Sequence, residues 1–413
     1  MRNNKRVLRE KLIMLIGITS DAYPSRRNII GIVKDAQYKK IKDPYSAMYS
    51  IATKMNCMVG RNIFPENDVR FQFNDFNFNT VSLFHFFNVV SYGRTPWVTT
   101  FETILPRFTS ALSNIHEDKP NALMLKSERK IRKAMQAVSS NSCKRIIALS
   151  ECNADMQRSF LKFFPQYRES IESKLIVLHP PQKAYVSQYS NKNIGLDGMI
   201  KFIFIGSGTF FRKGGGEVIE TLKELKEKYN YEIELTIVSS LNSDNYAVKV
   251  GPDDVRKMRG IITRNSSWVS YFPKLPNKEV LELMRKSHVG LLPTYADTYG
   301  YSVLECQASG CPVITTNIRA LPEINDNNKG WVIEIPKRPL GEAIYTTSED
   351  RRVISQAIRE GLKKAVHEIF KDRKVLMKKA EASIASIQYD HSVDKYAAKI
   401  EEIYDAAINF ERA

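Results

Sequence analysis

The stretch from Gly290 to Glu323 constrains the fold of this chain more than any other. It predicts a short apolar strand, a polar loop, a helix that ends in Ala-Ser-Gly, and a second apolar strand over Pro312–Thr316. A loop that leads from a strand into a helix offers backbone N–H groups and the positive end of the helix dipole, which suit an anionic ligand. Two acids, Asp297 and Glu305, flank the junction between loop and helix. The stretch therefore predicts a parallel α/β unit with an anion-binding loop.

The same alternation extends through the C-terminal half of the chain. Apolar strands are predicted over residues 201–206, 233–238, 269–272, 289–292 and 330–334. Amphipathic helices are predicted over Glu217–Tyr229 and Pro276–Lys286, and the tail from Val353 to Ala413 is predicted to be helical with one break near residues 389–392. This order is typical of a doubly wound parallel sheet with helices on both faces.

The N-terminal half shows a weaker version of this pattern. Its strands are predicted over residues 11–19, 81–88, 97–100, 145–150 and 175–178. A polar stretch between His179 and Gly198 is the expected junction, so we place the domains at residues 1–185 and 186–390 and a final helix at 391–413. The expected fold class is α/β, with two Rossmann-like domains.

A glycine-rich turn also favours an anionic ligand. Gly206 and Ser207 end the strand at 201–206, and Arg212-Lys213-Gly-Gly-Gly leads into the next helix. Glycine lets the backbone approach a ligand closely, and adjacent cationic side chains neutralise a pyrophosphate. The turn has neither the order of a Walker loop nor that of the GxGxxG fingerprint. The alternative is a tight turn with two solvated cations.

Together, in this order and separation, the two motifs closely resemble the donor site of retaining GT-B glycosyltransferases of family 4, also called group 1. The resemblance covers residues 200–335 well, the C-terminal helices in part and the first 180 residues weakly. It implies the GT-B fold: two Rossmann-like domains facing a central cleft, the N-terminal one for the acceptor and the C-terminal one for the nucleotide-sugar. It also implies that a last helix, near residues 394–409, packs back on the N-terminal domain.

The resemblance implies a role for each residue of the two motifs. Asp297 would lie beside the sugar, Glu305 would hold the ribose, and the basic pair Arg212 and Lys213 would bind the diphosphate and stabilise the leaving nucleotide. The other donor-binding positions belong to the two loops: Gly206, Ser207, Gly300, Tyr301, Ser302 and Val303. The chain departs from the family where Ser207 replaces a frequent arginine and Asp297 replaces the usual glutamate.

The N-terminal half contributes one more candidate catalytic residue. Family members often end the strand equivalent to 97–100 with a histidine near the sugar, and Glu102 takes that place. A carboxylate there would orient an acceptor hydroxyl or stabilise a cationic sugar. His85, on the preceding strand, either approaches the same cleft or is a hydrogen-bonded core residue. The remaining histidines, His116 among them, form no constellation.

The charge of the chain favours anionic partners. Its 62 Lys and Arg against 45 Asp and Glu give a formal charge of +17, which attracts nucleotide-sugars, nucleic acid or an anionic membrane leaflet. Seven basic residues lie between Lys126 and Arg145, with apolar residues near helical spacing. This segment is predicted to be a basic amphipathic helix, either a solvated surface helix or a peripheral membrane contact. No recognised nucleic-acid-binding module is visible in the sequence.

The sequence contains no motif typical of a metal-binding or redox-active site. No convincing DxD-type motif is present, and five cysteines without metal-ligand spacing predict reduced thiols in the cytoplasm. We therefore expect no metal and no cofactor, with a UDP- or GDP-type sugar donor as substrate. The expected function is a retaining, metal-independent transfer to a glycan or lipid-linked acceptor in cell-surface polysaccharide assembly, at the inner face of the plasma membrane. The alternatives are a catalytically silent GT-B partner subunit and a basic nucleic-acid-binding protein.

Overall fold

The computed structural model describes residues 14–409, apart from residues 62, 64, 65, 116, 118, 119 and 193. The predictions for His116 and for the chain before Met14 lie outside these residues. The chain divides into two compact units. Unit 1 consists of Met1–Ala148, Gln157–Pro180 and Asp394–Ala413, and unit 2 of Leu149–Met156 and Pro181–Val393. Helix α7 (Glu151–Leu161) begins in unit 2 and ends in unit 1.

Unit 2 is built on a parallel sheet of six strands in the order β11-β10-β9-β12-β13-β14. The strands are β9 (Ile200–Ser207), β10 (Ile233–Ser239), β11 (Val269–Phe272), β12 (Val289–Leu292), β13 (Val313–Thr316) and β14 (Gly330–Ile333). From β9 the chain builds outward to β11 and then returns to build the other half from β12. The order therefore reverses between β9 and β12, and in such sheets ligands bind at the carboxyl ends of the strands at this point.

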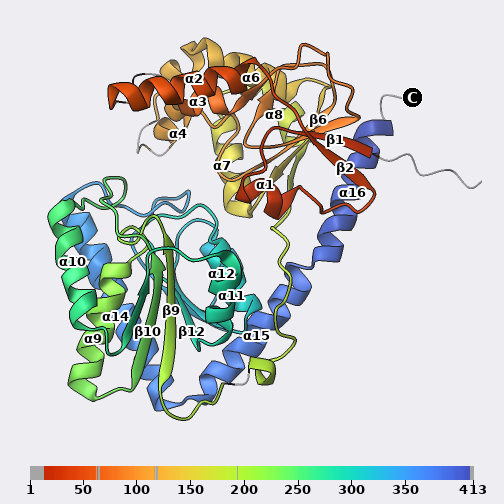
Figure 1. Cartoon of the computed structure of the whole chain (residues 1–413). Coiled ribbons are helices and arrows are strands. Elements are labelled where there is room, and N and C mark those ends of the chain that lie inside the picture. The colour runs from red at the N-terminus through yellow and green to blue at the C-terminus, as the bar shows by residue number, and fades with distance from the viewer. Residues whose placement is uncertain are drawn as a thin grey trace, which may run out of the picture. The chain divides into compact units, whose positions relative to one another are not determined.

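Helices cover both faces of this sheet, with α9, α10 and α14 on one side and α11, α12 and α15 on the other (Figure 1). Their bounds, with the short helices, are η1 (Tyr189–Lys192), α9 (Gly215–Tyr229), α10 (Pro252–Arg264), α11 (Asn277–Arg285), α12 (Tyr301–Ala308), α13 (Leu321–Ile324), α14 (Ser348–Lys371) and α15 (Lys374–Asp390). The predicted single break in the C-terminal tail was wrong, because a second break separates α14 from α15. Asp372 causes it locally: its side chain accepts a hydrogen bond from the backbone N–H of Lys374 and competes with the helix.

Unit 1 also contains a parallel sheet of six strands, in the order β2-β1-β4-β6-β7-β8, and a separate pair β3-β5. The strands are β1 (Met14–Ile18), β2 (Ala36–Lys40), β3 (Gln72–Phe73), β4 (Leu83–Phe87), β5 (Val90–Ser91), β6 (Trp97–Phe101), β7 (Cys143–Ala148) and β8 (Leu175–Val177). The helices are α1 (Tyr23–Asn28), α2 (Pro44–Val59), α3 (Glu66–Arg70), α4 (Thr109–Ile115), α5 (Ala122–Ser127), α6 (Arg129–Ser139), α8 (Pro165–Glu172) and α16 (Val393–Asn409). The two parallel sheets confirm the predicted fold class.

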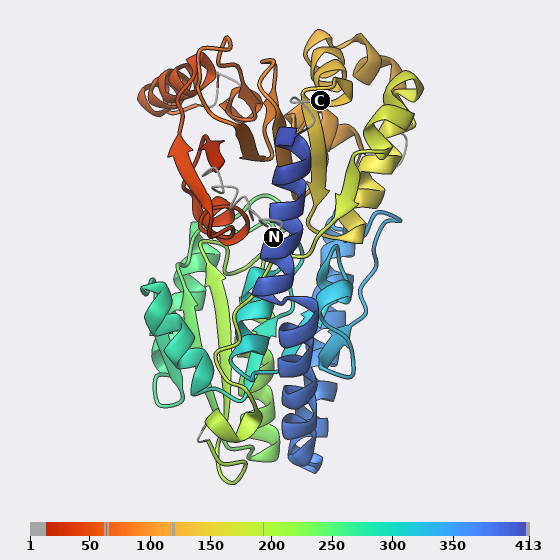
Figure 2. The same ribbon diagram turned by 90° about the vertical axis from the view of Figure 1, so that its right-hand side faces the viewer.

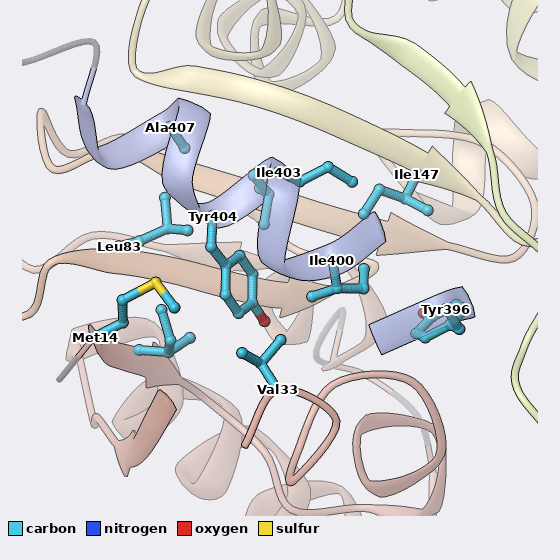
Figure 3. Packing of buried hydrophobic residues seen from close by; sticks show 11 residues of the cluster. Met14, Val33, Leu83, Ile147, Tyr396, Ile400, Ile403, Tyr404 and Ala407 are labelled. Atoms are coloured by element: carbon cyan, nitrogen blue, oxygen red, sulfur yellow. The ribbon is translucent and has the colours of Figure 1, made fainter. Parts of the chain in front are cut away.

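The C-terminal helix α16 completes the core of unit 1 (Figure 2). Its Ile400 and Tyr404 pack against side chains from four strands of the sheet, including Leu83, Val98 and Ile147 (Figure 3). Ile400 and Tyr404 are fully buried. The prediction that the last helix packs on the N-terminal domain is therefore confirmed.

The basic segment between Lys126 and Arg145 is not one helix. Helix α5 ends at Ser127, α6 covers Arg129–Ser139, and Lys144 and Arg145 lie on strand β7. The apolar side of α6 faces inward: Ile131, Ala134, Met135 and Val138 are all fully buried. This apolar face is therefore part of the protein core and is not available to a membrane.

Candidate functional site

Two loops meet where the strand order of unit 2 reverses. The glycine-rich turn follows β9 and the loop of residues 293–300 follows β12, and these two strands are paired neighbours. Across the loops, the Nζ atom of Lys213 lies 3.6 Å from Oδ2 of Asp297. Both side chains are largely buried, with exposed fractions of 20% and 14%. The structure thus joins a predicted diphosphate-binding cation to the predicted sugar-side acid.

Backbone contacts fix this meeting of the two loops. The N–H of Tyr295 donates to the carbonyl of Arg212 at 2.8 Å, and the Thr294 hydroxyl donates to the same carbonyl at 3.1 Å. Gly214, which caps α9 with φ of 82°, lies so close that a Cβ atom there would stand 2.1 Å from the carbonyl oxygen of Pro293. Only glycine allows both this left-handed conformation and this approach.

Asp297 is anchored by its own loop. Its Oδ1 atom accepts hydrogen bonds from the backbone N–H groups of Thr298, at 2.8 Å, and Tyr299, at 3.4 Å. These two bonds fix the position of the Asp297 carboxylate without any contribution from Lys213.

The start of α12 lies where the sequence predicted an anion-binding helix end. Gly300 is its N-cap with φ of 97°, and Tyr301 and Ser302 begin its first turn. The N–H of Val303 donates to the carbonyl of Gly300 at 2.9 Å, so this amide is already used within the turn. Glu305, the predicted ribose ligand, lies on α12 with only 6% of its surface exposed.

Arg212, the second predicted cation, is held by partners that the sequence did not indicate. Its Nε atom donates to Oδ2 of Asp244 at 2.9 Å, and its guanidinium lies 5.1 Å from the ring centre of Tyr246. Asp244 follows β10, the neighbour of β9 in the sheet.

Gly206 and Ser207 end strand β9. Ser207 adopts φ of 51°, and its carbonyl accepts a hydrogen bond from the N–H of Ser240 at 2.7 Å.

Hydrogen bonds from Tyr295 and Ser355 to Glu217, in a partly buried position, connect the loop after β12 to two helices. The Tyr295 hydroxyl donates to Oε1 of Glu217 at 2.7 Å, and the Ser355 hydroxyl donates to the same oxygen at 2.8 Å. Burial, and then the nearby Glu217 carboxylate, raises the pKa of Tyr295 above its usual value. Helices α9 and α14 thus hold the residue two positions before Asp297.

In unit 1, Glu102 follows β6 and is bound by its own unit. It is paired with Arg107, and its backbone N–H donates to the Asn88 side chain at 3.1 Å. His85 lies in the core, where its Nδ1 is 2.7 Å from the Tyr404 hydroxyl and its Nε2 is 2.9 Å from the Thr100 hydroxyl. Burial lowers the pKa of His85 to about 3, so its ring is neutral. Of the two interpretations of His85, the core residue is the one observed.

Within the residues that the structure describes between 14 and 409, no group of three or more His, Cys, Asp or Glu side chains is placed to hold a metal ion. No described helix is long and apolar enough to cross a membrane.

Comparison with known proteins identifies the unit that carries the two loops. Residues 190–367 match the sequence family described as "Glycosyl transferases group 1". This part of the chain is similar in sequence to group 1 glycosyltransferases. It contains the glycine-rich turn, the Asp297 loop and Glu305.

The chain is also similar to individual known proteins. A D-inositol 3-phosphate glycosyltransferase of Paenarthrobacter aurescens (strain TC1) is 24% identical over 163 residues, which is 37% of this chain and 37% of the relative. A UDP-forming trehalose-phosphate synthase from Burkholderia xenovorans has a TM-score of 0.58 at 10% identity, over 96% of this chain and 99% of that one. Anabaena Alr3699/HepE in complex with UDP has a TM-score of 0.52 at 12% identity, over 95% and 92%. The structural likenesses show the GT-B fold.

Proposed function

We propose that this chain is a retaining glycosyltransferase that moves a sugar from a UDP- or GDP-type donor to a glycan or a lipid-linked acceptor, without a metal. The Lys213–Asp297 pair, at the strand-order reversal of the unit that is similar to group 1 glycosyltransferases, carries the proposal. The pair places a cation where a diphosphate would bind and an acid beside it. The similar proteins that form or bind UDP support a nucleotide donor.

The charges of the site suit the departure of a nucleoside diphosphate. As the bond from sugar to diphosphate breaks, negative charge grows on the phosphate and positive charge on the sugar. Lys213, Arg212 and the first amides of α12 would stabilise the phosphate, and Asp297 the sugar. The acceptor hydroxyl would attack from the same face and pass its proton to a donor phosphate oxygen. Glu305 would hold the ribose, and Glu102 keeps its predicted role on the acceptor side.

The proposed setting is cell-surface polysaccharide assembly at the cytoplasmic face of the plasma membrane. The formal charge of +17 supports an anionic surface nearby. The basic side chains of the 126–145 segment remain a proposed peripheral contact, through charge alone because the apolar face of α6 is buried.

A panel of UDP- and GDP-sugars tests the proposal. We expect saturable binding of one nucleotide, slow sugar release that EDTA does not change, and at least about tenfold weaker binding for Lys213→Ala. Lys223→Ala is the matched control, because Lys223 is an exposed lysine of α9 that pairs with Glu227. Failure of every nucleotide to bind, or equal effects of the two substitutions, would overturn the donor-site assignment.

The second candidate is a catalytically silent partner subunit of another glycosyltransferase. One observation favours it: Arg212 is bonded to Asp244 and not directed to an open phosphate position. Tight nucleotide binding without sugar release, even with a range of acceptors, would support this candidate.

A further inference from the structure

Helix α2 of unit 1, which is labelled in Figure 1, carries a row of apolar side chains that are exposed. Met48, Ile51, Met55 and Met58 have exposed fractions of 52%, 58%, 40% and 87%. Their spacing of three, four and three residues places them along one flank of the helix. The buried side of α2 is a different one, marked by Ala52 and Asn56. The exposed row is therefore additional to the face that holds α2 in the fold.

A loop with two exposed phenylalanines is attached to the start of α2. Phe76 and Phe78 have exposed fractions of 57% and 87%. The loop is tied to the helix by Asp43, whose Oδ1 caps the helix at Ser46 N–H, 2.9 Å away, and whose Oδ2 accepts from Asn74 N–H at 2.8 Å. Phe76 itself adopts φ of 51°, a conformation that bulky residues rarely accept. The loop thus has a defined structure that presents phenyl rings to the outside.

The acids of this region whose side chains the structure describes face inward, and the bases face outward. Asp43, Asp68 and Asp75 are 8%, 5% and 5% exposed, and each accepts hydrogen bonds from the protein itself. Among the side chains that the structure describes, the exposed ionic groups on or next to α2 are Lys42, Lys54 and Arg61. Lys133 of α6 adds another positive charge, 4.4 Å from the ring centre of Tyr92, which lies 6.1 Å from that of Tyr45 on α2. The surface therefore combines apolar side chains with a positive rim.

We propose that this surface docks on an anionic lipid bilayer. The docking surface consists of Met48, Ile51, Met55, Met58, Phe76 and Phe78 with Lys42, Lys54 and Arg61. Apolar side chains of an interfacial helix enter the boundary between headgroups and acyl chains, while lysine and arginine remain at the level of the lipid phosphates. A second copy of the chain fits this surface less well, because two copies would bring positive rims of the same sign together.

Sedimentation with phospholipid vesicles tests the proposal on the full chain. We expect binding to vesicles that contain phosphatidylglycerol, weak binding to pure phosphatidylcholine, and loss of binding as salt is raised. The variant Met55→Ser/Met58→Ser should bind about tenfold more weakly. Its control is Met199→Ser/Met377→Ser, which removes two exposed methionines of unit 2, at 44% and 46%, and should leave binding unchanged.

The substitution Phe78→Trp places a fluorescent reporter on the docking surface and tests whether this surface enters the bilayer. The three natural tryptophans, Trp97, Trp268 and Trp331, are at most 9% exposed, so their emission should not respond to vesicles. In Phe78→Trp we expect a shift of the emission to shorter wavelength when phosphatidylglycerol vesicles are added. This inference rests on the membrane setting of the proposed function. Because UDP binding is measured separately, absence of vesicle binding with normal UDP affinity would remove that setting and leave the proposed donor site untouched.

Three results would overturn the proposal. The first is absence of binding to anionic vesicles at low salt. The second is vesicle binding that the Met55/Met58 variant retains, or that leaves the emission of Phe78→Trp unchanged, since the protein would then bind through another surface. The third is a dimer in solution that Met55→Ser/Met58→Ser dissociates, which would show that a second copy covers the row.

Discussion

Substitution of Gly214 by alanine tests how the two loops of the candidate site are joined. With φ of 82°, an L-residue at this position is strained by roughly 1 kcal/mol. Its Cβ would stand 2.1 Å from the carbonyl oxygen of Pro293, so the loop after β12 must retreat by about 1.3 Å to reach the 3.4 Å of an ordinary contact. That retreat stretches the hydrogen bond from Tyr295 N–H to the Arg212 carbonyl, which contributes about 1 kcal/mol. With the residual contact strain, we expect a loss of about 3 kcal/mol.

Gly216→Ala provides the matched control two residues away. Its φ is not positive, and the nearest atom to a new Cβ, the Cε of Met258, lies at an ordinary contact distance of 3.6 Å. Here alanine should stabilise the protein by about 0.5 kcal/mol, because it restricts the unfolded chain.

Urea unfolding followed by tryptophan fluorescence compares the two variants, and calorimetry gives their affinity for UDP. We expect Gly214→Ala to lower the urea midpoint and to weaken UDP binding, because the shift separates Lys213 from the loop of Asp297. Equal midpoints for the two variants would refute the close approach. A destabilised Gly214→Ala with wild-type UDP affinity would refute the idea that the contact positions Lys213.

Three further predictions follow from single contacts. Asp244→Asn removes the carboxylate that holds Arg212, so UDP should bind about fivefold more tightly by calorimetry, and unchanged affinity would show that the two do not compete. Tyr295→Phe removes the donor to Glu217 and should lower the free energy of unfolding by about 1 kcal/mol; no loss would mean the bond is replaced. Because burial lowers the pKa of His85 to about 3, the unfolded chain binds a proton below about pH 6.5 that the folded chain does not, and stability should fall by about 2 kcal/mol at pH 5. His85→Gln should flatten this slope, and equal slopes would contradict the assignment.

The sequence predicted unit 2 well because its signals are local. Strand β9, the turn at Arg212 and Lys213, and the loop of Asp297 each carry glycines, acids or apolar runs that act within a few residues. Helix α6 shows the limit of this approach. Its basic residues continue into Lys144 and Arg145, but the serines at 139, 140 and 142 end the helix before β7 begins.

Contacts between residues that follow neighbouring strands could not be predicted from the sequence. Asp244 meets Arg212 only because β10 and β9 are adjacent, and no local pattern reports which strands become neighbours. The exposed flank of α2 has a similar cause. Apolar residues at helical spacing, such as Met48, Ile51 and Met55, normally predict a core face, and periodicity does not distinguish a face that is buried from one that is exposed.

Under the proposed function, the two cations of the site differ in what they must give up to bind a diphosphate. Lys213 lies 3.6 Å from Asp297, longer than a charged hydrogen bond, and Asp297 keeps two backbone donors if Lys213 moves. Arg212 makes a direct bond of 2.9 Å to Asp244, which is only 9% exposed. If Arg212 leaves, this largely buried carboxylate loses its charged partner and keeps one backbone donor, the N–H of Tyr246 at 3.0 Å. Lys213 is therefore the cation that can engage a donor first, and Arg212 the one whose release from Asp244 sets the cost of full engagement. Position 207 is serine here, where the family often has arginine. Arg212 is therefore the arginine of this turn that must leave Asp244 to bind the diphosphate.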